Sequence, residues 1–185
     1  EVVVVSFSIP DNSTWHLILT ESGTVSPVNI VIACDKFKGS MTAAEACEAI
    51  ARALPASCCI QTIPVADGGE GMATALTDSQ NGDWIHHQVR DPLGAPVEAG
   101  FGLIDEGETA VIEMAAASGL DTLGGRPNDP WRASTFGTGQ LIREAAARGV
   151  KSILLGIGGS ATNDGGTGMA EALGFSFLDG SGSPI

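Results

Sequence analysis

The sequence predicts an α/β protein with two separate sheets, and two observations carry this prediction. In residues 28–65, an apolar run, an amphipathic helical pattern and a second apolar run follow one another, an order that implies a right-handed parallel βαβ unit. In residues 83–114, three strand-like segments are joined by short turns, which favours an antiparallel meander. Such a meander needs a sheet of its own, so a second subdomain is expected.

The βαβ pattern gives two strands and one helix. Residues 28–33 and 60–65 are apolar runs of a length that suits buried strands. Between them, Thr42 and Glu45 match a capping box, in which each side chain accepts a hydrogen bond from the other residue's backbone N–H. A helix is therefore expected to begin at this point, between two parallel strands.

The second subdomain is predicted to contain a mixed sheet. Its first connection carries Pro92 and Gly94 at the second and fourth positions, as a type I turn favours. The expected strands are residues 83–90, 96–104, 109–114, 152–157 and 175–178, and the expected helices are residues 138–148 and 164–173.

Residues 1–27 differ from the α/β sequence that follows. Residues 2–5 and 15–20 are apolar, and the polar segment 10–13 between them suggests a hairpin turn. We interpret residues 1–27 as an upstream or unrelated extension, expect the native start near Val28, and expect the protein to continue beyond Ile185.

Composition restricts the classes of partner. The 185 residues carry 22 acidic and 9 basic side chains, for a net charge of −13, which disfavours nucleic acid and anionic membranes as partners. The four cysteines contain no C-x-x-C pair, and the three histidines lack zinc-site spacing, so reduced thiols are expected. No apolar run approaches the length of a membrane span, and the N-terminus lacks the basic start of a signal peptide. We expect a cytoplasmic protein whose partner is a small molecule.

Polar residues follow both strands of the predicted βαβ unit. Lys36, Lys38 and Ser40 come after the first strand, where ligands of open α/β sheets usually bind, and could hold a phosphate. Asp67 and Glu70 lie among glycines after the second strand and suit a magnesium ion or a general base. The alternatives are solvated surface lysines in the first case and a turn with a capping aspartate in the second.

A glycine-rich loop, residues 156–168, follows the predicted strand 152–157. Six of its thirteen residues are glycine, and it also contains Ser160, Asn163 and Asp164. Glycines such as Gly158 and Gly159 let the backbone approach a ligand closely, and the N–H groups of a following helix suit an anion. The loop is a candidate phosphate or carboxylate cradle with Asp164 at its rim, and the alternative is a mobile surface loop.

Two nucleotide-binding fingerprints were compared with this loop. The P-loop pattern is absent, because the chain contains no Gly-Lys dipeptide. Gly156, Gly158 and Ala161 match a dinucleotide fingerprint, but its helix would then contain three further glycines in its first turns, each costing about 1 kcal/mol. An extended anion-binding connection is the better interpretation.

Four further positions are left undecided by the sequence. Glu113 ends an apolar strand and either faces a ligand or caps a helix. Residues 135–139 form another glycine and threonine helix entrance with the same ambiguity, and Arg126 and Arg132 are the nearest cations for a substrate carboxylate.

Five motifs together resemble the bacterial glycerate kinase family in order and spacing, over the chain from about Val28 to its end. They are residues 31–40, 64–71, 91–94, 111–119 and 156–168. The family phosphorylates D-glycerate with ATP and magnesium, usually giving 2-phosphoglycerate, and its members are about twice as long as the matching part here. Cys34 stands where the family often has proline.

The resemblance implies two α/β domains with a cleft between them. Residues 28–66 would be the N-terminal part of a discontinuous Rossmann-like domain, incomplete in this chain. Residues 67–185 would be a second domain inserted into it. The missing C-terminal half would complete the first domain.

The resemblance also implies roles for the polar clusters. Lys36, Lys38 and Ser40 would bind phosphate or glycerate, with Lys38 counted among the catalytic residues. Asp67 and Glu70 would bind metal or position the substrate hydroxyl, and Asp67 is our choice as general base. The loop would form the opposite wall, where Gly158, Gly159, Ser160 and Asn163 bind phosphate or substrate and Asp164 binds the metal.

Two other functions stay open at this point. A truncated chain could be an inactive module that binds phosphate or an organic acid. A nicotinamide-dependent oxidoreductase would follow from the dinucleotide fingerprint. The regiochemistry of phosphorylation and the oligomeric state are not fixed by the sequence.

Overall fold

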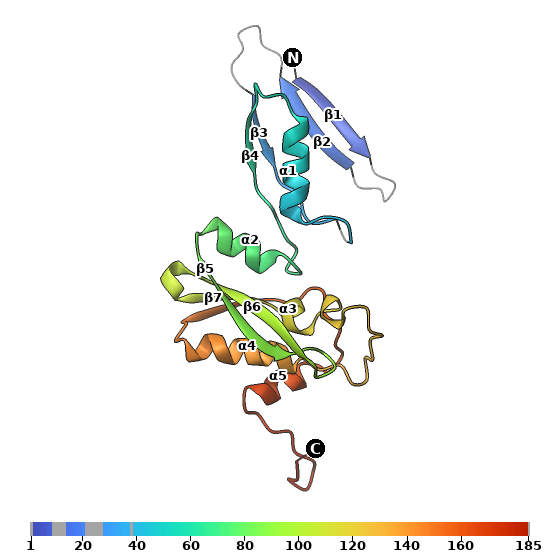
Figure 1. Ribbon diagram of the computed structural model, residues 1–185, viewed down its shortest axis with the longest axis vertical. Helices are drawn as coiled ribbons and strands as arrows, with labels where there is room; N and C mark the ends of the chain where they lie inside the picture. The colour runs from blue at the N-terminus through green and yellow to red at the C-terminus, as the bar shows by residue number, and fades with distance from the viewer. Residues whose placement is uncertain (1, 9–13, 21–27, 38, 185) are drawn as a thin grey trace. The chain divides into compact units, whose positions relative to one another are not determined.

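The computed structural model describes residues 2–8, 14–20, 28–37 and 39–184 (Figure 1). The chain divides into two compact units, Glu1–Pro64 and Val65–Ile185. We describe each unit by itself.

The first unit contains the predicted βαβ arrangement. Strands β3 (Asn29–Ile32) and β4 (Cys59–Thr62) pair in parallel, and helix α1 (Ala43–Ala53) connects them. Strands β1 (Val2–Ser8) and β2 (Thr14–Thr20) form a separate antiparallel pair, as expected for a hairpin. Most of the expected turn at residues 10–13 lies outside the described residues.

Helix α1 begins at the predicted capping box. The Glu45 N–H donates to Thr42 Oγ1 over 3.2 Å, and the Thr42 N–H donates to Glu45 Oε2 over 2.8 Å. These bonds satisfy two of the N–H groups that a helix start leaves without partners. The bonds from the backbone and hydroxyl of Thr42 also lower the pKa of the Glu45 carboxyl.

Two buried thiols lie side by side in the core of this unit. Cys34 and Cys47 pack with Ile30, Ile32 and Ala46, and their sulfur atoms are 3.2 Å apart. Burial, and next the hydrogen bond with Cys47, raise the pKa of the Cys34 thiol to about 11. The four cysteines are free, as expected, although Cys59 is exposed.

The second unit is built on the predicted mixed sheet. Its strand order is β5-β6-β7-β8, in which the first two pairs are antiparallel and β7 and β8 are parallel. The strands are β5 (Asp83–Arg90), β6 (Pro96–Ile104), β7 (Thr109–Glu113) and β8 (Ser152–Gly156). The helices are α2 (Met72–Ser79), α3 (Met114–Ser118), α4 (Phe136–Ala147) and α5 (Thr167–Ala172), with short 3₁₀ turns at Asp105–Gly107 and Asp121–Leu123.

Helices cover both faces of this sheet, because β7 alternates its buried side chains between two cores. Ala110 and Ile112 pack in a cluster with Leu141 of α4, whereas Val111 packs with Ala73 of α2. Figure 1 shows α2 and α4 on opposite sides of the strands. The α/β fold class predicted from the sequence is therefore confirmed, with one parallel and one mixed sheet.

Two expected elements differ in the structure. The helix expected from residue 164 begins only at Thr167, because Gly165 and Gly166 have φ values of 62° and 82° that a helix does not accommodate. The strand expected at residues 175–178 is not formed: the Phe175 N–H donates to Ala170 O at the end of α5, and Leu178 makes only an isolated bridge with Pro184. None of the described helices has the length and apolar character needed to cross a bilayer.

Candidate active site

Two glycine-rich segments of the second unit meet at one end of its sheet. The parallel strands β7 and β8 finish side by side, with Glu113 paired to Gly156. There the Gly158 N–H donates to Gly68 O over 3.0 Å. A Cβ atom on Gly158 would lie 2.7 Å from Gly69 Cα, and one on Gly156 would lie 2.5 Å from Gly68 O. The two segments therefore pack backbone against backbone, and side chains at these positions would separate them.

This close approach brings predicted site residues of the two segments together. Asp67 is exposed, and its Oδ1 accepts a hydrogen bond from the Gly69 N–H over 3.1 Å. Glu70 is half-buried, and its Oε1 lies 3.3 Å from the position that a Cβ atom on Gly159 would take. Of the site residues predicted from the sequence, Glu70 and Gly159 thus lie next to each other within the second unit.

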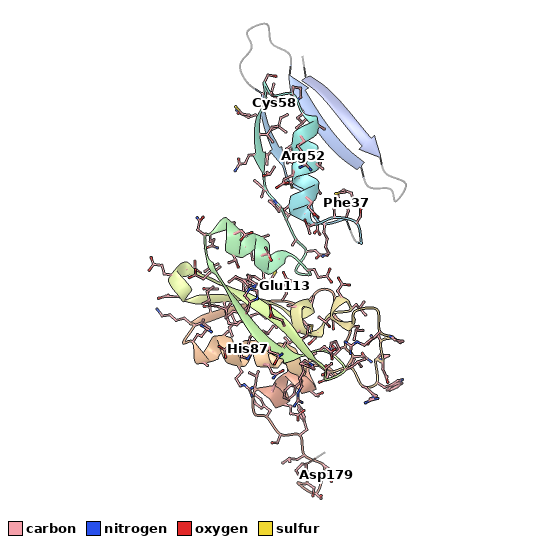
Figure 2. The ribbon with its side chains drawn as sticks, viewed as in Figure 1. Phe37, Arg52, Cys58, His87, Glu113 and Asp179 are labelled. Atoms are coloured by element: carbon pink, nitrogen blue, oxygen red, sulfur yellow. The ribbon has the colours of Figure 1, made fainter. Side chains whose placement is uncertain are left out.

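Glu113 adds a third carboxylate at the same end of the sheet. It is 8% exposed, and its Oε1 accepts a hydrogen bond from the Ala73 N–H over 2.6 Å. Figure 2 labels this side chain between the strands and α2. The positive end of α2 favours a negative charge, so Glu113 caps this helix from across the fold. The sequence left Glu113 undecided, because a partner 40 residues away gives no local signal.

The middle of the loop is fixed to a neighbouring segment of the same unit. The Leu120 N–H donates to Gly159 O over 3.2 Å, and the Ala161 N–H donates to Ser118 O over 2.9 Å. Ser160 Oγ bonds with the hydroxyl of Thr162 over 2.8 Å, and Asn163 is exposed. These bonds distinguish the loop from a surface segment held only at its ends.

Asp164 ties the far end of the loop to α4. Its Oδ2 accepts bonds from the backbone N–H and the hydroxyl of Thr135, both over 2.8 Å, and from the Gly168 N–H over 3.1 Å. Its Oδ1 accepts from the Gly166 N–H over 3.1 Å. Burial opposes ionisation of Asp164, but these four bonds outweigh it and hold its pKa below the ordinary value.

Thr135 is the residue that the sequence did not assign here. It is 1% exposed, and its hydroxyl accepts a bond from the Met169 N–H over 2.9 Å while donating to Asp164. It thereby links the starts of α4 and α5. The only sequence signal for Thr135 was its place in the glycine- and threonine-rich segment 135–139, where α4 begins.

The remaining predicted residues lie in the first unit or elsewhere. Lys36 is half-buried, and its N–H donates to the Asp35 carboxylate over 2.6 Å. The N–H of the exposed Ser40 donates to Phe37 O over 2.8 Å. Lys38 lies outside the described residues. The roles predicted for these three residues therefore stay predictions.

The two undecided arginines also have positions. Arg126 pairs with the buried Asp91 of the turn between β5 and β6. Burial opposes ionisation of Asp91, but the bonds from Arg126 and from the N–H groups of Ala95 and Leu93 keep its pKa low. Arg126 is thus part of the scaffold. Arg132 is exposed and lines a pocket beside Asp164.

The dinucleotide fingerprint is not completed by the fold. In that motif the helix opens at the glycine run, whereas α5 begins at Thr167, well beyond Gly158. The structure therefore supports the extended connection that the glycine content favoured.

Gly158→Ala is expected to destabilise the second unit by about 2 kcal/mol, because its new methyl group would press on the Gly69 backbone. Urea unfolding followed by the fluorescence of Trp84 and Trp131 measures this change. Gly180→Ala is the matched control, since a Cβ atom there meets no heavy atom within 4 Å. Equal unfolding midpoints for the two variants would contradict a tight junction at Gly158.

Comparison with known proteins places this geometry in a family. Residues 30–185 match the model of the glycerate kinase family. Over 85% of its length the chain is 50% identical to the glycerate kinase of Bacillus subtilis (strain 168) and 44% identical to the glycerate 2-kinase of Escherichia coli (strain K12). It spans 42% of the length of each of these relatives. A crystal structure provisionally named glycerate kinase 2, from Salmonella typhimurium LT2, superposes with a TM-score of 0.69 at 43% identity, covering 86% of this chain and 44% of that one.

Proposed function

Because the chain belongs to the glycerate kinase family, we propose that it supplies part of an active site that transfers the terminal phosphate of ATP to a hydroxyl group of D-glycerate. One observation of the structure supports this most: the Asp67–Glu70 and Gly156–Gly159 segments pack against each other where β7 and β8 end. Phosphoryl transfer depends mainly on positioning and on charge neutralisation, which backbone N–H groups and carboxylates at one fixed place can provide.

The product is expected to be 2-phosphoglycerate, with 3-phosphoglycerate as the alternative. The name of the Escherichia coli relative, glycerate 2-kinase, favours the first product. We further propose that residues 28–66 begin a Rossmann-like domain, that residues 67–185 form the domain inserted into it, and that the protein acts in the cytoplasm.

The loop is proposed to bind phosphate groups through Gly159, Ser160 and Asn163, while Gly158, predicted to bind them too, donates its N–H to Gly68 O and fixes the loop in place. Its backbone is held by hydrogen bonds to Gly68, Ser118 and Leu120, so its polar groups are positioned before a ligand arrives. Preorganised donors of this kind stabilise charge that develops during a reaction without a reorganisation cost.

Asp67 is proposed as the general base and Glu70 as its neighbour in positioning the substrate hydroxyl. Asp67 is exposed and can reach a ligand, while the Gly69 N–H fixes one of its oxygens. Lys36, Lys38 and Ser40 are proposed to bind glycerate or phosphate from the first unit, where an ammonium group would pair with an anion.

Magnesium is the metal that this chemistry implies, and the carboxylates present fit it. Mg²⁺ takes oxygen ligands and is usually held by one or two carboxylates together with substrate phosphates. The described residues contain no group of three or more potential ligands, so Asp67, Glu70 and the phosphates would share this task. When bound, the ion would neutralise charge on the phosphate oxygens.

Asp164 is proposed to organise the loop rather than to bind the metal. Four donors already engage its two oxygens, and three of them converge on Oδ2. A carboxylate that is used in this way by the fold has little capacity left for a cation.

The function is tested by ADP formation that depends on both D-glycerate and magnesium. Two proteins are compared: the 185-residue chain, and the same chain joined to the part of the Bacillus subtilis relative that it does not cover. We expect the joined protein to form ADP. Activity in the joined protein alone would make the 185-residue chain a binding module. Reduction of a nicotinamide cofactor without ADP formation would overturn the proposal.

A further inference from the structure

A pocket lies at the opposite end of the 156–168 loop from Glu70 and Gly159. Its volume is about 430 Å³, and all of its lining residues belong to the second unit. One wall comes from the segment before α4, another from the end of the loop and from α5, and Phe177 adds a third. The lining residues that matter for its chemistry are Trp131, Arg132, Ser134, Asp164, Glu171 and Phe177.

Two aromatic side chains give this pocket its character. Trp131 is 94% exposed and Phe177 is 40% exposed, although large apolar side chains usually find partners inside the protein. The Trp131 segment is nevertheless well fixed. The Trp131 N–H donates to Asp129 Oδ1 over 3.1 Å, and the Ser134 N–H donates to Pro92 O over 2.9 Å. The backbone therefore places Trp131 at the edge of the pocket, where its indole ring is accessible to a ligand.

The floor of the pocket is already formed. Asp164 and Thr135 are joined by the bonds described above, and Gly168 packs so closely that a Cβ atom there would meet Ser134 Oγ and lie 2.8 Å from Phe136 N. Aromatic side chains beside a few fixed polar groups are typical of small-molecule sites.

The size and chemistry of the pocket indicate which ligand it suits. A three-carbon acid such as glycerate is far smaller than this volume and needs polar contacts rather than aromatic walls. Aromatic side chains instead stack on heterocyclic bases. Arg132 offers a cation for a phosphate, and the exposed Glu171 offers an acceptor for an amino group on a base. The charge of Asp164 is already stabilised by its four donors within the protein.

We propose that this pocket binds the purine nucleoside part of the phosphoryl donor, with the base against Trp131 and Phe177. The identification of the donor as ATP rests on the proposed function. From the pocket, the loop runs back through Asn163 and Ser160 to Gly159 beside Glu70. Asp164 comes five positions after Gly159, so the distance between them cannot exceed about 18 Å, which is enough for a triphosphate chain. The loop would then carry the base at one end and the transferred phosphate at the other.

Equilibrium dialysis with radiolabelled adenosine tests this proposal on the 185-residue chain, which contains all the residues that line the pocket in the described structure. Trp131→Ala is expected to weaken adenosine binding about tenfold, and Trp131→Phe is expected to retain most of it. Trp84→Phe, on the half-exposed indole of β5, is the matched control and should leave binding unchanged. Trp131 is so exposed that its removal should not disturb folding, which circular dichroism checks.

Ribose 5-phosphate separates base recognition from phosphate recognition. It is expected to compete with adenosine much more weakly than AMP does, because it lacks the base that would contact Trp131 and Phe177. Competition by this sugar phosphate as strong as that by AMP, absence of adenosine binding, or equal binding by wild type and Trp131→Ala would each overturn the proposal. In the joined protein, ADP formation with an unchanged KM for ATP in Trp131→Ala would refute the pocket and leave the kinase function intact. Adenosine binding that depends on Trp131, without ADP formation, would refute the kinase function and leave the pocket intact.

Discussion

Asp67→Asn in the joined protein is expected to lower kcat about a thousandfold, because general bases typically contribute about 10²–10⁴-fold. The amide keeps the size of the side chain and an acceptor for the Gly69 N–H, so the turn around it should persist. It cannot take the proton of the glycerate hydroxyl, nor give a metal ion the charge of a carboxylate. The loss should therefore appear in kcat, with the KM for ATP changed much less.

Steady-state kinetics of ADP release measure this effect, and Asp83→Asn is its control. Asp83 is an exposed carboxylate of the same unit at the start of β5, so its amide makes the same change in net charge. A drop of less than tenfold in Asp67→Asn, or an equal drop in both variants, would remove Asp67 from the role of base. Magnesium binding measured by calorimetry in the presence of ADP provides a second readout, which should weaken if Asp67 is also a ligand.

Asp164→Ala is expected to cost about 3 kcal/mol of stability, because hydrogen bonds to a charged group contribute about 1.5–3 kcal/mol each and their loss leaves donors without partners. The backbone and hydroxyl of the buried Thr135 would lose their acceptor, and so would the Gly168 N–H. Urea unfolding measures the change. Asp179→Ala is the control, since Asp179 also accepts bonds from Ser181 and Ser183 but in an exposed turn, and it should change stability little. Equal effects would mean that the burial of the Asp164 network is unimportant.

The same network predicts a dependence on pH. The folded pKa of Asp164 lies below its ordinary value, so the stabilisation is fully present above the ordinary pKa and is lost as the pH falls through the folded pKa. The difference in unfolding free energy between wild type and Asp164→Asn should therefore be largest near neutrality and should shrink below about pH 4. A difference that stays constant down to pH 2 would contradict the ionised state assigned to Asp164.

Local signals were enough for much of the fold. Strands β5 and β6 have the bounds that the sequence predicted, and α1 begins at its capping box. Helix α2 was not predicted, because Gly69 and Gly71 directly before it favour a loop and its cap, Glu113, is distant in sequence. The strand expected at residues 175–178 did not form. Its sequence suits a strand, but Leu178 makes only an isolated bridge with Pro184, and the segment pairs with no other strand among the described residues.

In the candidate site too, the local sequence predicted some features, whereas others depend on residues distant in the chain. The glycine and carboxylate content of residues 67–71 and 156–168 predicted that both segments bind a ligand. That Gly158 bonds to Gly68 depends on the order of strands in the sheet, which residue spacing does not reveal. The resemblance to the family implied metal binding for Asp164, whereas we propose that Asp164 organises the loop. Its bonds to Thr135, 29 residues earlier in the chain, follow from no local pattern.

The position of Glu113 also bears on whether a nucleotide would bind free or with a cation attached. The positive end of α2 could have attracted a phosphate, but the fold uses it for an internal carboxylate. Glu113, Asp67 and Glu70 add negative charge in a chain whose net charge is −13, which disfavours the approach of free anions. A nucleotide would enter most favourably with its counter-ion already attached, so that the cation and the nucleotide are recognised as one species. Excess uncomplexed nucleotide should then be a poor competitor rather than a strong inhibitor.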